Sequence, residues 1–224
     1  PVRRGGIPSG SAPPPQPGGL FTTTYDPAVW IPAPPCRRIP STGAERFERW
    51  VTMAGSRFLT SADDPAGPKA AAIGRILRAL GSLDYPSWDP FWLHKWIHWP
   101  TLRVTPTAVI VSGIPAEDGG SVEELRHFCG VGSPAALEEP LVEEISSPIL
   151  GPGLRGLVYS AEAADGSKEV HATLSYVWPV KVLDEGEVEA GIVRLWASGT
   201  PPQILAAQPD IEALAMTLRM EAVD

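Results

Sequence analysis

Cysteine and long apolar runs are both scarce in this sequence. The 224 residues include only two cysteines, Cys36 and Cys129, which lie far apart. A framework of several disulfides is therefore excluded, and the pair is typical of reduced thiols in a cytoplasmic protein. One disulfide closing a long loop is the alternative. No run approaches the 18 apolar residues of a membrane span, and no apolar segment of a signal peptide follows Arg3 and Arg4. We expect a cytoplasmic protein without membrane insertion.

Asparagine is absent, and arginine outnumbers lysine 14 to 4. Together with the 26 prolines, this usage indicates a GC-rich bacterial source. Basic clusters are also lacking, because the net charge is −8 and the excess of acid falls after residue 43. An acidic body is a poor partner for nucleic acid. We therefore predict no nucleic-acid partner.

The motifs that mark common enzymes are missing. The sequence contains no glycine-rich phosphate loop, no dinucleotide-binding fingerprint and no nucleophile elbow. His127 and Cys129 are two residues apart, and such residues do not face each other on a helix. We therefore predict no cofactor and no catalytic residue.

What the sequence has is a proline-rich beginning. Residues 1–40 contain 11 prolines and 5 glycines, which exclude a helix or a central strand. This composition favours an extended arm. Its apolar residues are spaced like the anchors of a segment that binds along a surface. The anchors we predict as partner contacts are Phe21, Tyr25, Trp30 and Ile31.

Helical signals follow the arm. Thr42 and Glu45 form a capping box ahead of apolar residues at helical spacing, and a second helix is predicted over 68–80. Ser121 and Glu124 form a further capping box that opens a short helix.

Strand signals dominate the second half. The segment 101–114 is rich in β-branched residues, and three further strands are predicted over 154–162, 170–180 and 188–198. The last of these is apolar on both sides, so it is either covered on both faces or exposes Trp196.

The predicted fold class is α+β, with an antiparallel meander of about four strands on which helices pack. The predicted organisation is an arm over residues 1–41 and a single domain over 42–224. Within the domain we expect a helical part over 42–100, a sheet-rich part over 101–207 and a C-terminal helix over 209–221.

The stretch 86–100 concentrates four of the eight tryptophans and two of the four histidines. Asp89, Pro90 and the stop at Pro100 predict a helix over 89–99. Its tryptophans would form one buried stripe, while His94 and His98 would share another face. A metal site on the two histidines is the less favoured interpretation, because Lys95 occupies the position where a zinc protease has its glutamate.

These patterns favour a non-enzymatic structural or interaction subunit of a larger assembly, with other protein subunits as partners. A homo-oligomer is one form of such an assembly. Docking would use the arm and an aromatic surface that includes Trp88, Phe91 and Trp196. The alternative is a small-molecule-binding domain or enzyme whose pocket lies between the sheet and the helix 89–99.

Overall fold

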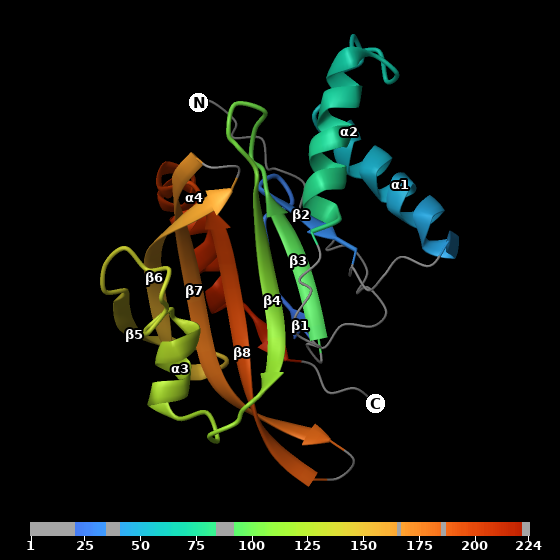
Figure 1. The fold of residues 1–224 in the computed structure, drawn as a ribbon. Coiled ribbons are helices and arrows are strands. Elements are labelled where there is room, and N and C mark those ends of the chain that lie inside the picture. The colour runs from blue at the N-terminus through green and yellow to red at the C-terminus, as the bar shows by residue number, and fades with distance from the viewer. Residues whose placement is uncertain (1–20, 35–40, 84–91, 165–166, 185–186, 221–224) are drawn as a thin grey trace, which may run out of the picture.

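The computed structural model describes residues 21–34, 41–83, 92–164, 167–184 and 187–220. They form a seven-stranded antiparallel sheet in the order β2-β3-β4-β8-β7-β6-β5, and β1 pairs with β9 in a separate small sheet (Figure 1). The predicted α+β class with an antiparallel sheet is therefore confirmed. The strands are β1 (Phe21–Thr22), β2 (Trp30–Ala33), β3 (Trp92–His98), β4 (Thr107–Pro115), β5 (Leu141–Ser147), β6 (Gly151–Ala164), β7 (Ser167–Asp184), β8 (Glu187–Gly199) and β9 (Arg219–Met220), and the helices are α1 (Ser41–Ser56), α2 (Pro68–Gly81), α3 (Val122–Phe128) and α4 (Pro201–Met216).

The sheet has helices on both faces (Figure 1). Helix α4 lies on one side, which we call the α4 face, and α1, α2 and α3 lie on the other, which we call the α3 face. Paired residues of an antiparallel sheet point to the same face, so the register sorts the side chains. Leu174, Tyr176 and Leu195 belong to the α4 face, whereas Ser175 and Trp196 belong to the α3 face.

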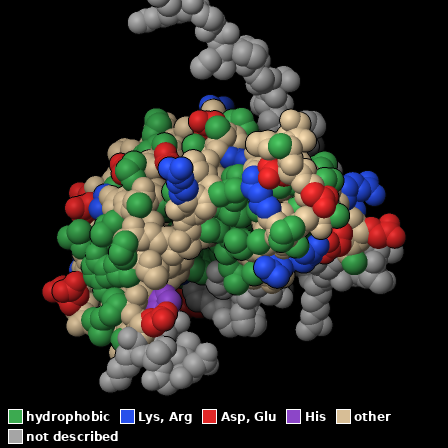
Figure 2. All heavy atoms as spheres, turned by 90° about the horizontal axis from the view of Figure 1, so that it is seen from above, with side chains coloured by type: hydrophobic (Ala, Val, Ile, Leu, Met, Phe, Trp, Pro, Cys, Tyr) green, Lys and Arg blue, Asp and Glu red, His purple; other side chains and the backbone are tan. Residues whose placement is uncertain are grey.

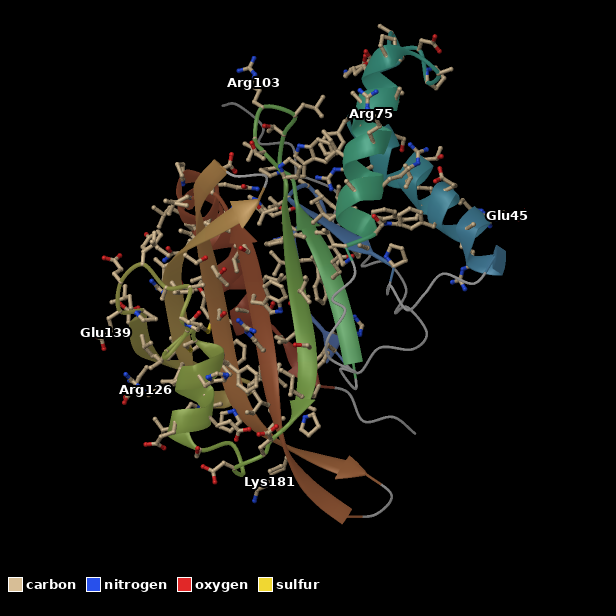
Figure 3. All side chains as sticks on the ribbon, in the orientation of Figure 1. Glu45, Arg75, Arg103, Arg126, Glu139 and Lys181 are labelled. Atoms are coloured by element: carbon tan, nitrogen blue, oxygen red, sulfur yellow. The ribbon has the colours of Figure 1, made fainter. Side chains whose placement is uncertain are left out.

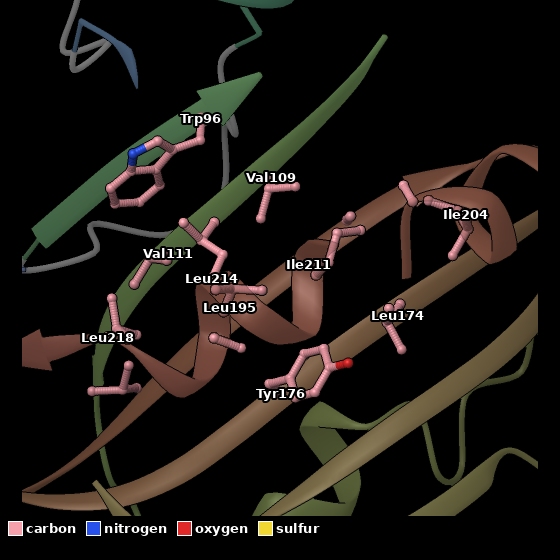
Figure 4. Close-up of a cluster of buried hydrophobic side chains, with 14 of the residues drawn as sticks. Trp96, Val109, Val111, Leu174, Tyr176, Leu195, Ile204, Ile211, Leu214 and Leu218 are labelled. Atoms are coloured by element: carbon pink, nitrogen blue, oxygen red, sulfur yellow. The ribbon is translucent and has the colours of Figure 1, made fainter. Parts of the chain in front are cut away.

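The main hydrophobic core lies between the sheet and α4. Ile204, Ile211 and Leu214 of the helix pack against the strand residues of the α4 face (Figure 4). Apolar residues that alternate along each strand supply that layer, as expected for a sheet face covered by a helix. The α4-face layer comprises Trp96, Val109, Val111, Leu174, Tyr176 and Leu195, with Leu218 beyond the helix end.

The α3 face carries two smaller clusters at its opposite ends. Helices α1 and α2 cover Ile31 and Ile97 of the outer strands β2 and β3. Helix α3 covers Leu154 and Val177 at the other end, and Ser121 caps it by accepting a hydrogen bond from the Glu124 amide at 3.2 Å. The predicted helices over 68–80 and after Ser121 are thus confirmed. The middle of this face belongs to β4 and β8.

The predicted helix over 89–99 is wrong. Residues Trp92–His98 form strand β3, which pairs with β2 on one side and with β4 on the other. Alternate residues of β3 point to opposite faces, and each face has apolar partners to bury them: Trp96 joins the α4-face core and Ile97 joins the α1–α2 cluster. A segment of seven residues between prolines fits either period, so the two neighbouring strands decide the outcome.

The element boundaries also differ from the predicted parts of the chain. Residues Trp30–Ala33 of the expected arm form the edge strand β2, and the helical part ends before β3. The C-terminal helix was predicted to begin at residue 209. Helix α4 begins eight residues earlier, at Pro201, and contains Pro209 in its interior. Pro201 occupies the first helical position, where the missing amide costs nothing. The other parts of the predicted arm, residues 1–20 and 35–40, lie outside the residues that the structure describes.

Candidate functional site

Four of the predicted partner contacts come from the N-terminal segment, and three of them lie in the chain's own core. Phe21, Trp30 and Ile31 are buried, and Trp30 packs edge-on to the His98 ring at a centroid distance of 5.0 Å. Tyr25 is partly buried against the same cluster as Phe21. A buried side chain offers no surface to another subunit, so Phe21, Trp30 and Ile31 are not partner contacts in this fold. The partly buried Tyr25 stays a predicted contact.

The other predicted contacts are aromatic residues of the body. Trp88 and Phe91 lie outside the described residues. Trp196 is on the α3 face of the central strand β8, where it is partly buried. It is therefore the aromatic residue of this set that stays close to solvent on the described surface of the sheet.

His94 and His98 share the α4 face of β3 instead of a helix face. The Nε2 atom of the buried His98 lies 2.8 Å from Oδ2 of Asp210 on α4. The His94 ring packs between Phe21 and Trp96, with centroid distances of 5.8 and 5.7 Å, and burial lowers the pKa of His94. No group of three potential metal ligands forms among the described residues. The two histidines therefore have structural contacts: His98 joins β3 to α4, and His94 packs against Phe21 of the small sheet.

Cys129 follows α3 and is a free, buried cysteine. Burial raises the pKa of its thiol to about 11, against the opposing effect of nearby Arg194 and Arg126. The thiol is therefore protonated at neutral pH and is a poor nucleophile. Its role is packing, because a Cβ atom placed on Gly156 would lie 2.4 Å from the Cβ of Cys129.

A charged side chain stands in the middle of the α3 face. Arg194 of β8 lies directly across from Ser112 of β4, and its Nη2 donates a hydrogen bond to Oγ of Ser175 on β7 at 3.1 Å. Its guanidinium carbon lies 5.3 Å from the ring centroid of Trp196 and 5.9 Å from that of Phe128. Both distances are in the range of cation–π contacts. Three strands and the end of α3 thus converge on this one cation.

Arg194 has no anionic partner among the described residues. The ion pairs of that part of the chain involve other cations, such as Arg78 with Glu48 and Arg155 with Glu143. The Nε atom of Arg194 is buried without a hydrogen-bond partner there. Burial lowers the pKa of Arg194 to about 10, so the side chain keeps its charge at neutral pH. We call Arg194, Ser112, Ser175, Trp196 and Phe128 the Arg194 cluster.

Sequence reasoning missed Arg194, although one signal for it was present. The strand predicted over 188–198 is apolar on both sides, and Arg194 is the charged residue in its middle. A charge at such a position must find a partner or remain costly, because buried arginine is rare. The neighbours that define the cluster come from β4, β7 and α3, which sequence spacing does not bring together.

A second feature lies on the α4 face at the β5 edge of the sheet. Leu137 is 55%, Leu141 54% and Val170 44% exposed. The register places two of them around Tyr159 of β6, since Leu141 on β5 pairs with Leu157 and Val170 on β7 pairs with Ala161. The Leu137 amide donates to the carbonyl of Tyr159, which lies between those two β6 positions. We call Leu137, Leu141, Tyr159 and Val170 the apolar strip.

The remaining surface is mixed in charge. On the face seen in Figure 2, basic and acidic side chains are interspersed, and apolar side chains gather at the left, on the side of β5 and β6. Glu45, Arg75, Arg103, Arg126, Glu139 and Lys181 all project away from the sheet (Figure 3). None of the described helices has both the length and the hydropathy to cross a bilayer.

Protein-family models and curated proteins offer no comparison for these two features: no family model matches the chain, and no curated protein has a significantly similar sequence.

Proposed function

We propose that this chain is a non-enzymatic interaction subunit of a larger protein assembly and that it docks through the apolar strip. The observation that carries the proposal is the exposure of Leu137, Leu141 and Val170 around Tyr159 at the β5 side of the sheet. Sheet faces with apolar side chains are normally covered, and contiguous exposed apolar patches mark sites of protein interaction.

The position of the strip supports this role. Helix α4 packs on β4, β7 and β8, whereas the strip belongs to β5, β6 and the adjoining end of β7. The strip also borders β5, which ends the order of strands in the sheet. A partner could therefore cover the strip and the backbone of β5 with one surface, as strand-adding partners do.

The earlier alternative changes with the fold. A pocket between the sheet and a helix over 89–99 is not formed, because that segment is the strand β3 itself. Tyr176 on the sheet side of that position is fully buried beneath α4 and is not available to line a pocket (Figure 4).

The test compares charge substitutions on and off the strip. Leu141→Glu and Val170→Glu place a carboxylate in the strip, and Met53→Glu on α1 is the matched control because Met53 is 64% exposed. Tagged versions of each protein are recovered from the source cells and their complexes measured by native mass spectrometry. Analytical ultracentrifugation of the purified protein detects self-association.

We expect the two strip variants to lose a stoichiometric protein partner that wild type and Met53→Glu retain. All variants should keep the far-UV circular dichroism of wild type, because the altered side chains are exposed. Retention of the same partner by both strip variants would refute the proposal. Its loss in Met53→Glu as well would show that charge alone, and not the strip, controls association.

A further inference from the structure

We propose that the α3 face contains a binding site for a monocarboxylate ligand with an apolar or aromatic body, centred on the Arg194 cluster. This site lies on the face of the sheet opposite the apolar strip. It therefore stands or falls independently of the docking function.

The first argument is the state of the guanidinium. Arginine has five N–H donors, and the described residues accept from it once, at Oγ of Ser175. Its Nε is buried and unpartnered, and no carboxylate of the described residues pairs with it. An unpaired charge is costly where part of the guanidinium is buried, and proteins ordinarily pair it.

Other arginines of the chain show the contrast. Arg78 binds Glu48 through Nε and Nη2, at 2.9 and 2.7 Å from the two carboxylate oxygens. Arg57 donates to the backbone carbonyls of Trp30 and Ala28. Arg78 and Arg57 thus have carboxylate or carbonyl oxygens as acceptors. Arg194 instead has two aromatic rings and one hydroxyl group around it. The cluster thus has donors in excess, which is the property of a site for an anion.

The second argument concerns the shape of the ligand. A guanidinium is a planar fork that matches the two oxygens of a carboxylate. Ser175 lies beside the fork, and Ser112 lies across from it on β4, so hydroxyl groups border the anion position. The rings of Trp196 and Phe128 flank the same guanidinium. A ligand with a carboxylate and an apolar or aromatic body could contact the guanidinium and hydroxyl groups with the first and the two rings with the second.

The charge count favours a monoanion over phosphate. Lys95 of the same face donates to the carbonyl oxygens of Leu83 at 2.6 Å and Gly81 at 3.1 Å, so it is engaged at the end of α2. Arg126 projects away from the sheet on α3 (Figure 3), so among the described residues Arg194 is the cation that the cluster presents. One cation neutralises a carboxylate but leaves a phosphate dianion with excess charge in a partly desolvated site.

Access is provided by the partial exposure of Arg194 and Trp196. Both side chains belong to β8, in the middle of the face, with α2 and α3 at its two ends (Figure 1). A ligand that stacks on Trp196 can therefore present its carboxylate to Arg194 from the solvent side.

The experiment uses defined probes with the full chain. Isothermal titration calorimetry measures the binding of indole-3-acetate and octanoate, with indole-3-acetamide as the uncharged match and inorganic phosphate as the competing anion. The variants are Arg194→Met and Arg194→Lys, with Arg126→Met as control because Arg126 projects away from the sheet on α3 (Figure 3).

We expect at least one carboxylate to bind with a Kd in the millimolar range or tighter, and the amide and phosphate at least tenfold more weakly. Arg194→Met should weaken the carboxylate at least tenfold, Arg194→Lys should weaken it less, and Arg126→Met should change it less than twofold. Unchanged binding in Arg194→Met, equal binding of phosphate, or no binding of either carboxylate at 10 mM overturns the proposal.

A readout on the wild-type protein keeps the test decisive if Arg194→Met fails to fold. The Nε–H signal of Arg194 is observed by ¹⁵N nuclear magnetic resonance during titration with the same probes. A carboxylate at the guanidinium should shift this signal, and indole-3-acetamide should leave it in place. A signal that stays fixed while the carboxylate binds elsewhere would contradict the assignment to Arg194.

Discussion

Removing the charge of Arg194 should make the ligand-free protein more stable. The perturbation is Arg194→Met, which keeps a long flexible side chain but removes the guanidinium. Burial lowers the pKa of Arg194 from 12.5 to about 10. One pKa unit corresponds to about 1.4 kcal/mol, so the folded protein bears a penalty of about 3 kcal/mol for holding this charge. The penalty is fully present at neutral pH, since Arg194 is protonated there in both the folded and the unfolded state.

Part of that gain is offset by contacts that the substitution removes. The hydrogen bond to Ser175 contributes roughly 1 kcal/mol, and the contacts with Trp196 and Phe128 together contribute roughly 1 to 2 kcal/mol. The net expectation is a stabilisation of about 1 kcal/mol. In a chain of 224 residues this raises the Tm by about 3 °C.

Urea unfolding followed by circular dichroism measures the change, together with calorimetric Tm values. Arg103→Met is the control, because Arg103 is exposed at the β3–β4 connection, and its Tm should stay within about 1 °C of wild type (Figure 3). A loss of 1 kcal/mol or more in Arg194→Met would refute the reasoning. It would mean that the guanidinium is already satisfied within the fold, and the ligand site would lose its basis.

Three further substitutions test the structure. Trp30→Ala should cost about 3 to 5 kcal/mol in urea unfolding, because the ring is buried in the chain's own core; a cost below 1 kcal/mol would restore a free arm. Gly156→Ala should cost about 1 to 3 kcal/mol, since the new Cβ meets Cys129, and an unchanged Tm would contradict that packing. Burial lowers the pKa of His94, so the folded state favours the neutral ring and loses stability as the pH falls below about 6.5. His94→Leu should therefore lose less unfolding free energy than wild type between pH 7 and pH 5. Equal losses in the two proteins would disprove this.

Local signals were enough for much of the fold. Helix α2 and the hairpin strands β6, β7 and β8 lie close to their predicted positions, because turn residues, caps and periodicity agree there. Strand β3 was mistaken for a helix because seven residues bracketed by prolines satisfy both periods. Its ladder with β4 comes from residues that follow it by about fifteen positions, which a local pattern does not weigh.

The candidate site was less accessible to sequence reasoning. Phe21, Trp30 and Ile31 were predicted as contacts with a partner, because the spacing of apolar anchors does not say whether they pack against another chain or the same one. The structure places them in the chain's own core. Arg194 was visible as a charge in an apolar strand, yet the lack of a counterion for it among the described residues depends on neighbours on three other elements.

The two edges of the large sheet differ in a way that bears on assembly. At β2, Arg57 donates to the carbonyl of Trp30, and the Trp50 indole donates to that of Pro32 at 2.7 Å. Side chains thus occupy backbone acceptors that another strand would need, while β5 ends the other side of the sheet. With β2 blocked in this way, strand pairing between copies of the chain would have to use β5, and joining two copies at β5 would use both of those edges. Growth by that route ends at a closed pair instead of a filament.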